Sequence, residues 1–216
     1  MGGHLDGRVY GATRVVSCPI DGAGQGHYVL AASTGSIGAG AGSNSELFHF
    51  RWTSTGVLCK ILFVRLTGLR ASTAFTAGDI DISLSIARSW TAAGTGGTFP
   101  TLTGNNQKLD TDFASTLMGG QRLATTAALG VGTKTLDAQP VGQILTHSSG
   151  GFSSATPIIG SIYLPTTELF RASISDGQAP ITLANNEGVV IRATVPATGV
   201  WTLGFVIGWC ETILED

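Results

Sequence analysis

Charged side chains are the scarcest feature of this sequence. Asp, Glu, Lys and Arg make up 12% of its 216 residues, against roughly 25% in a typical soluble domain. A compact monomer of 22.1 kDa exposes roughly 9,000 Å², which leaves about one charge per 350 Å² of surface. With a mean hydropathy of +0.27, so sparse a charge favours association. We expect much of the surface to be buried against other subunits, although Ser and Thr can also solvate a surface without charge.

Basic clusters are also missing, and we expect no leader segment. Lys and Arg are dispersed singly and the formal net charge is −2, so the electrostatic footprint of a nucleic-acid-binding protein is not present. The first residues contain no apolar core of a signal peptide. Pro196 and Gly199 interrupt the one apolar stretch, 193–210, that is long enough to suggest a membrane span. We therefore expect no direct nucleic-acid partner, no membrane partner, and folding in a cytoplasm.

Cysteine and histidine are few and poorly placed for chemistry. The cysteines are odd in number, lie far apart and include no Cys-x-x-Cys pair: Cys18, Cys59 and Cys210. The histidines show no metal-ligand spacing such as His-x-x-x-His: His4, His27, His49 and His147. We expect reduced thiols and no zinc site. His49 is expected to hydrogen-bond within the core or at an interface.

Two acidic pairs are the strongest candidates for a ligand site. Asp79-x-Asp81 and Asp110-x-Asp112 each place two carboxylates on one side of an extended chain, as a Ca²⁺ or Mg²⁺ site requires. Such ions take six or more oxygen ligands, and no neighbouring Asp/Asn-rich loop supplies them. The sequence also has no Gly-x-Ser-x-Gly elbow and no Gly-Lys-Ser/Thr phosphate loop. We expect solvent-facing acids, no metal, no cofactor and no enzymatic activity.

Alternation of apolar and polar residues is what the sequence does have. Two alternating runs lie near the C-terminal end, separated by the Pro/Gly segment 196–199. Their apolar positions share one face of each run: Val189, Ile191, Ala193 and Val195, then Trp201, Leu203, Phe205, Ile207 and Trp209. Because side chains alternate with period two along a strand, this pattern predicts two antiparallel strands joined by a short turn. We place this hairpin at the centre of a sandwich.

The same period predicts further strands upstream. They are expected over residues 28–32, 46–53, 57–69, 79–89, 121–128, 157–164 and 181–184, with 136–146 ambiguous. In 79–89 the Ile and Leu positions face inward, and Asp81, Ser83 and Ser85 face outward. A helical turn is expected within 110–118. Long Gly/Ser/Thr loops are expected at 34–45, 90–109 and 147–156.

Together these elements predict an all-β protein built as a single β-sandwich. About eight to ten short strands in one array, with no clear linker, are typical of a jelly roll or a related two-sheet sandwich. We divide the chain into an extended N-terminal arm, 1–26, and a β-sandwich domain, 27–216. The arm and the long loops are the segments expected to reach other subunits.

Aromatic residues are the candidates for packing surfaces. Trp52, Trp90, Trp201 and Trp209 would be a sugar-stacking platform if exposed, but core or interface packing is the better interpretation because aromatics dominate both. The candidate interface residues are Phe48, Phe50, Trp52, Trp90, Phe99, Trp201 and Trp209.

Four stretches, 46–52, 87–98, 102–109 and 183–202, resemble uncharacterised structural proteins of tailed bacteriophages. The resemblance covers most of 46–211 and lies in overall texture and a few distinctive strings. It implies a virion component of the capsid decoration (cement) type: β-rich, Gly/Thr-rich and oligomeric, often trimeric. No functional residue carries over, because such a role depends on surfaces.

The resulting hypothesis is a non-enzymatic virion protein that self-associates, as a homotrimer, and stabilises the phage head. Its partners would be copies of itself and the major capsid protein, whose neighbouring subunits it would bridge after assembly in the host cytoplasm. The alternative is a tail or head-fibre module that binds a host-surface glycan.

Overall fold

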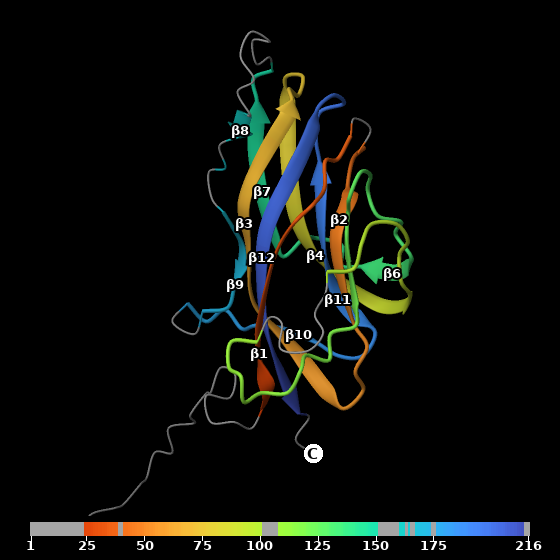
Figure 1. Cartoon of the computed structure of the whole chain (residues 1–216), viewed down its shortest axis with the longest axis vertical. Coiled ribbons are helices and arrows are strands. Elements are labelled where there is room, and N and C mark those ends of the chain that lie inside the picture. The colour runs from red at the N-terminus through yellow and green to blue at the C-terminus, as the bar shows by residue number, and fades with distance from the viewer. Residues whose placement is uncertain are drawn as a thin grey trace, which may run out of the picture.

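The computed structural model describes residues 24–38, 41–100, 108–150, 160–162, 164, 167–173 and 176–213. In this part of the chain all regular structure is β, and two antiparallel sheets pack face to face (Figure 1). Sheet A contains β1 (Gly24–Ser33), β3 (Val57–Thr73), β8 (Gly160–Ile162), β9 (Glu168–Arg171), β10 (Ile181–Leu183) and β12 (Val200–Ile213). Sheet B contains β2 (Ser45–Trp52), β4 (Gly78–Ala92), β5 (Gly120–Leu123), β6 (Thr133–Leu136), β7 (Gly142–Ser148) and β11 (Glu187–Thr194). The predicted all-β sandwich is confirmed.

The order of the strands is that of a jelly roll. Successive long strands alternate between the sheets, since β1 and β3 lie in sheet A and β2 and β4 in sheet B. The chain then returns, so that β11 inserts between β2 and β4 and β12 inserts between β1 and β3. This interleaving of two sheets is the double Greek-key arrangement of a jelly roll.

Large apolar side chains at alternate, inward-facing positions of the strands fill the space between the sheets. The inward positions of β12 are large and at most 1% exposed: Trp201, Leu203, Phe205, Ile207 and Trp209. Aromatic rings meet across the two sheets, with ring centroids 4.6 Å apart for Phe48 and Phe205 and 6.2 Å apart for Phe50 and Trp209. Each such side chain contributes roughly 1.5–3 kcal/mol on burial. The core therefore lies wholly within one chain.

The two C-terminal strands form, but they do not pair with each other. β11 pairs with β2 and β4, whereas β12 pairs with β1 and β3, so the predicted hairpin is wrong. Each strand has one strongly apolar face, and placing the strands in facing sheets buries these faces against each other. The connection crosses between the sheets, and Gly199 within it has a φ of 119°, which favours glycine.

Several local predictions differ from the structure. Residues 110–118 contain turns in place of the expected helical turn, β5 ends at Leu123, and β9 was not expected. The ambiguous region holds the end of β6 and the start of β7. In the predicted loop 34–45, Ile37 is 0% exposed and exchanges two backbone hydrogen bonds with Trp201, of 2.8 and 3.0 Å.

The predicted arm overlaps the sandwich by a few residues, because β1 begins at Gly24. The rest of the arm lies outside the described residues, as do 101–107 in one predicted loop and 151–159 across another loop and a predicted strand.

Candidate interaction surface

The outer face of sheet B is covered by the chain's own excursion between β4 and β7. We call its described parts, residues 93–100 and 124–132 together with β6, the loop layer; in Figure 1 it lies beside β2 and β11. Backbone hydrogen bonds hold it down, from the Leu129 amide to the Glu46 carbonyl (2.8 Å) and from the Ala124 amide to the Leu47 carbonyl (2.8 Å). Outward-facing side chains of sheet B beneath this layer, such as Glu46 and His49, are therefore buried.

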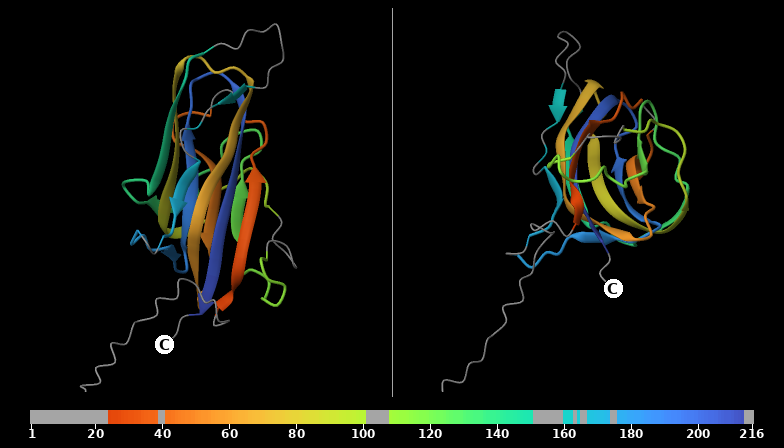
Figure 2. Two further views of the ribbon diagram at one scale, coloured as in Figure 1. Left: turned by 90° about the vertical axis from the view of Figure 1, so that its left-hand side faces the viewer. Right: turned by 60° about the horizontal axis from the view of Figure 1, so that its bottom comes forward.

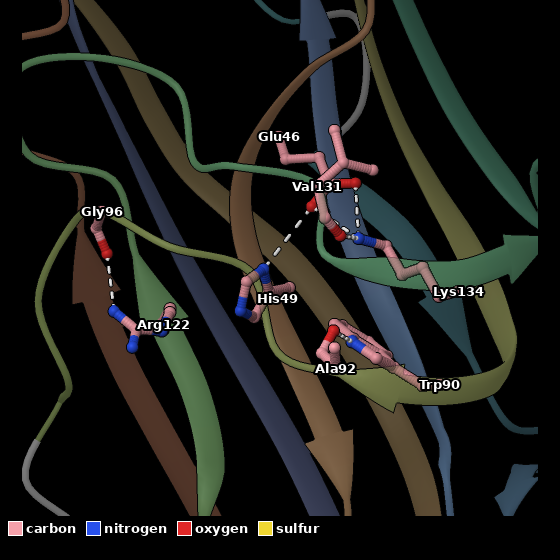
Figure 3. Close-up of polar contacts among 8 residues, drawn as sticks. All are labelled: Glu46, His49, Trp90, Ala92, Gly96, Arg122, Val131 and Lys134. Carbon is pink, nitrogen blue, oxygen red and sulfur yellow. Dashed lines mark hydrogen bonds and ion pairs between the residues drawn. The ribbon is translucent and has the colours of Figure 1, made fainter.

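An ion pair lies beneath this layer (Figure 3). Lys134 Nζ is 2.8 and 2.9 Å from the two carboxylate oxygens of Glu46, and it also donates to the Val131 carbonyl. The Lys134 side chain is 0% exposed and that of Glu46 is 3% exposed. The ammonium group also lies 4.6 Å from the centroid of the Trp90 ring. The attraction between the two opposite charges, the hydrogen bonds and the Trp90 ring together offset the cost of removing both charged groups from water.

His49 completes the buried group. Its Nδ1 is 3.5 Å from Glu46 Oε2, its ring meets the Trp90 ring edge-on with centroids 5.1 Å apart, and it is 0% exposed. An added Cβ at Gly94 would lie 2.8 Å from His49 Cε1 and 1.9 Å from the Gly130 carbonyl oxygen, so only glycine fits there. The arrangement fastens the loop layer to the sheet.

A second buried acid lies at the other end of the sandwich. The Glu211 carboxylate is 0% exposed. It accepts hydrogen bonds from the Leu117 amide (3.1 and 3.0 Å), the Thr116 hydroxyl and the Trp209 indole N–H (3.2 Å). Burial raises the pKa of Glu211, and these hydrogen bonds oppose the rise. Burial, with Glu211 nearby, also raises the pKa of the Cys59 thiol well above its usual range.

Glu211 fixes an exposed loop, residues 108–118, that we call the acidic loop. Tyr28 donates its hydroxyl hydrogen bond to the Ala114 carbonyl (2.8 Å), and the Leu109 amide bonds to the His27 carbonyl (3.0 Å), so the loop lies along the edge of β1. Its outer surface carries Leu109 and Leu117, which are 67% and 44% exposed. The acids of the predicted pair at positions 110 and 112 are exposed on the same loop.

The outer face of sheet A has no such cover. In the left view of Figure 2, no described element lies over the outer face of β1, β12 and β3; we call this surface the bare face. The residues that point outward are small or apolar over much of it: Val29, Ala31, Gly68, Gly204, Val206 and Gly208. An added Cβ at Gly208 would lie 2.3 Å from Phe63 Cε1, so this ring lies over the glycine. The centre of the face is therefore flat.

Three cations run along β3 on the bare face. Lys60, Arg65 and Arg70 lie opposite outward positions of β12, and Arg65 and Arg70 are exposed. No described carboxylate forms an ion pair with any of the three. By contrast, the neighbouring Arg171 is paired with Glu168 at 2.5 Å. Arg65 instead lies 4.9 Å from the centroid of the Phe63 ring, and Glu168 stands opposite it in the β3–β9 ladder. The bare face thus carries cations that form no ion pair with a described carboxylate.

The seven aromatic residues predicted for an interface separate into two groups. Six are at most 1% exposed: Phe48, Phe50, Trp52, Trp90, Trp201 and Trp209. The structure reassigns them from a surface to the interior, because two sheets and the loop layer of one chain already bury them. Phe99 is 57% exposed, with the Arg122 guanidinium 4.1 Å from its ring centroid. With all four tryptophans buried, the sugar-stacking platform is also excluded.

Other predicted site residues take up local roles. Asp79 and Asp81 share the outer face of β4, where Asp79 contacts His147 Nδ1 at 2.8 Å and Asp81 accepts a 2.8 Å hydrogen bond from Gln143. Within the described ranges no three His, Cys, Asp or Glu side chains gather as a metal site.

Cys210 is disulfide-bonded, which is at odds with the expectation of reduced thiols, whereas Cys59 is free.

Sequence reasoning did not find the residues that organise these surfaces. Ser83 and Ser85, predicted to face solvent, are 5% and 0% exposed, and nothing in the sequence marks Lys134 or Glu211 as buried.

No family model, curated protein or solved structure matches the chain. The part of the chain that the structure describes contains no helix long and apolar enough to cross a membrane. The surfaces above are therefore the basis for inferring function.

Proposed function

We propose that the protein is a non-enzymatic virion structural protein of a tailed bacteriophage, of the capsid decoration type. It self-associates, as a homotrimer, and bridges neighbouring major capsid subunits on the phage head. The observation that carries this proposal is the bare face, a flat surface whose cations form no ion pair with a described carboxylate, on a chain that is otherwise poor in charge. The jelly roll is also an architecture of viral capsid domains.

Two features separate the bare face from ordinary solvent-exposed sheet. Antiparallel sheets that face water usually carry alternate polar side chains, whereas β12 presents Gly204, Val206 and Gly208 at its centre. Second, Lys60, Arg65 and Arg70 form no ion pair with a described carboxylate, although Glu168 stands opposite Arg65 in the β3–β9 ladder. A protein surface of opposite charge would supply such pairs. Both features fit a protein interface with a polar rim.

Glycan binding by a fibre module has less support. Its aromatic platform would need exposed tryptophans, and Trp52, Trp90, Trp201 and Trp209 lie inside the sandwich. An enzyme would need convergent acids or a nucleophile beside a base. The two buried acids, Glu46 and Glu211, lie in separate groups, and each is engaged by hydrogen bonds.

The test has two parts. Analytical ultracentrifugation of the purified protein at about 1–100 µM should show a trimer that dissociates on dilution, and a stable monomer at the upper concentration would refute self-association. Electron microscopy of phage particles carrying a tagged copy should then place the label on the head. Particles without the protein should release DNA at a lower temperature, since binding only to the assembled shell stabilises it by mass action. Equal heat resistance would refute the decoration role.

A further inference from the structure

Resting on the self-association proposed above, we infer how the copies meet: the acidic loop of one protomer docks on the bare face of the next. The contact is heterologous, so each protomer contributes both surfaces. Its occupant is a second copy of this chain.

Charge complementarity is the first reason. Lys60, Arg65 and Arg70 on the bare face form no ion pair with a described carboxylate, whereas the acidic loop exposes Asp110 and Asp112. The loop also contains Lys108, whose backbone is bridged to Tyr28 at the β1 edge, so two acids and one lysine give it a net charge of −1. Opposite charges across an interface steer the approach and fix its register, and like charges disfavour the wrong pairing.

Apolar complementarity is the second reason. Leu109 is the most exposed of the large apolar side chains described, at 67%, and Leu117 is 44% exposed. Together with the two acids they make a mixed acidic and apolar surface on one short loop. The bare face offers the counterpart, because Ala31 and Val206 lie beside Arg65 across the β1–β12–β3 ladder.

The loop is also held ready for binding. Glu211 bonds to Leu117 and Thr116, and Tyr28 bonds to Ala114, so two buried groups anchor the loop before any partner arrives. Fixing a loop in its bound shape removes part of the ordering entropy that association otherwise costs. This gives the buried Glu211 a role beyond the core.

A contact between an edge and a face is compatible with the proposed ring. The acidic loop lies along the edge of sheet A, beside β1, whereas the bare face is the broad side of the same sheet (Figure 2). An edge that docks on a face turns each copy relative to the last. A head-to-tail contact of this kind generates a ring when the rotation closes, and a trimer is the smallest such ring.

Charge reversal tests the inference with this chain alone. The face variant is Arg65→Glu with Arg70→Glu, the loop variant is Asp110→Lys with Asp112→Lys, and the combined variant carries all four changes. The control, Asp79→Lys with Asp81→Lys, makes the same charge change on the outer face of sheet B. Thermal unfolding establishes that each variant is folded, and sedimentation gives its dissociation constant.

We expect the face and loop variants each to raise the dissociation constant by roughly 100-fold, since facing like charges disfavour the contact. The combined variant should return to within about tenfold of the wild type, and the control should be unchanged. A wild-type trimer that neither reversal weakens overturns this inference and leaves self-association standing. If the face variant alone weakens self-association, the acidic loop is not the segment that binds the bare face. A monomeric wild type refutes the proposed self-association itself.

Discussion

The outer faces of the two sheets differ in what the chain lays over them. On sheet B the loop layer buries outward-facing side chains, and Glu46, His49 and Val190 are at most 3% exposed. On sheet A no described segment does so, and Arg65 and Arg70 stay exposed. The comparison shows that alternation along a strand fixes the direction of a side chain but not its burial. Described segments of the chain cover one face, and the other is the face that we propose binds a partner.

Breaking the ion pair beneath the loop layer should have the largest effect. Lys134→Ala leaves the Glu46 carboxylate buried without its partner, which should lower the free energy of unfolding by about 3–5 kcal/mol. Urea denaturation measures this loss. The double variant Glu46→Met with Lys134→Met removes both charges and should lie much closer to the wild type. If the single variant were as stable as the double variant, the buried-charge account would be wrong.

The next largest effect is the difference in stability between a methyl group added beneath the loop layer and one added on the bare face. At Gly94, beneath the loop layer, a Cβ would lie 1.9 Å from the Gly130 carbonyl oxygen, whereas at Gly68 on the bare face nothing lies within 4 Å. Gly94→Ala should therefore destabilise by about 1–3 kcal/mol. Gly68→Ala should be neutral or stabilise by up to about 1 kcal/mol, because it restricts the unfolded chain. Equal denaturation midpoints would remove the distinction between the faces.

The pH dependence of the free energy of unfolding should reveal the contribution of the buried Glu211. Because its pKa is raised on folding, the folded state holds this proton more tightly than the unfolded state. The resulting stabilisation is fully present below the unfolded carboxyl pKa of about 4.3 and is lost as pH rises through the folded pKa.

Glu211→Gln removes this titration while keeping one acceptor oxygen. Unfolding free energies measured from about pH 4 to pH 7 should therefore fall more steeply in the wild type than in the variant. At pH 7 the two should differ by roughly 1 kcal/mol or less. A wild type that gains stability over the variant as pH rises would contradict the assigned direction.

The exposed pair on β4 and β7 should matter least. The side chains of Asp79 and His147 are 77% and 60% exposed, so water screens their attraction. Asp79→Ala should change the free energy of unfolding by no more than about 0.5 kcal/mol. A loss comparable to that of Lys134→Ala would show that this surface is covered in solution.

Strand positions could be predicted because they depend on local alternation. The inward faces of 79–89 and of the two C-terminal runs are confirmed, since Ile80, Ile82 and Leu84 are 0% exposed, as are Val189 and Ile191. Which strands pair could not be predicted. The Pro/Gly segment 196–199 permits a hairpin turn or a crossing between sheets, and the facing sheets decide between them.

The candidate surfaces were less accessible to sequence reasoning. The aromatic residues were singled out as interface candidates, but their burial depends on sheets formed from distant strands, and six of the seven lie in the core. Lys134 and Glu46 are 88 residues apart, and Glu211 meets its loop across 94 residues. Period-two patterns carry no signal for such contacts. The sparse charge, by contrast, was visible from composition and supports the proposed interface between copies.

The place of β11 and β12 at the centre of the two sheets has a consequence for synthesis. Neither sheet can acquire its middle strand until the segment from Glu187 to Ile213 has left the ribosome. The 121 residues that follow the end of β4 at Ala92, through the end of β12 at Ile213, take about 6–24 s to synthesise at roughly 5–20 residues per second. During that time β2, β3 and β4 lack their central partner strands. Nascent chains of this protein are thus exposed to premature aggregation, and chaperones that hold polypeptides during translation should influence its yield more than its final stability.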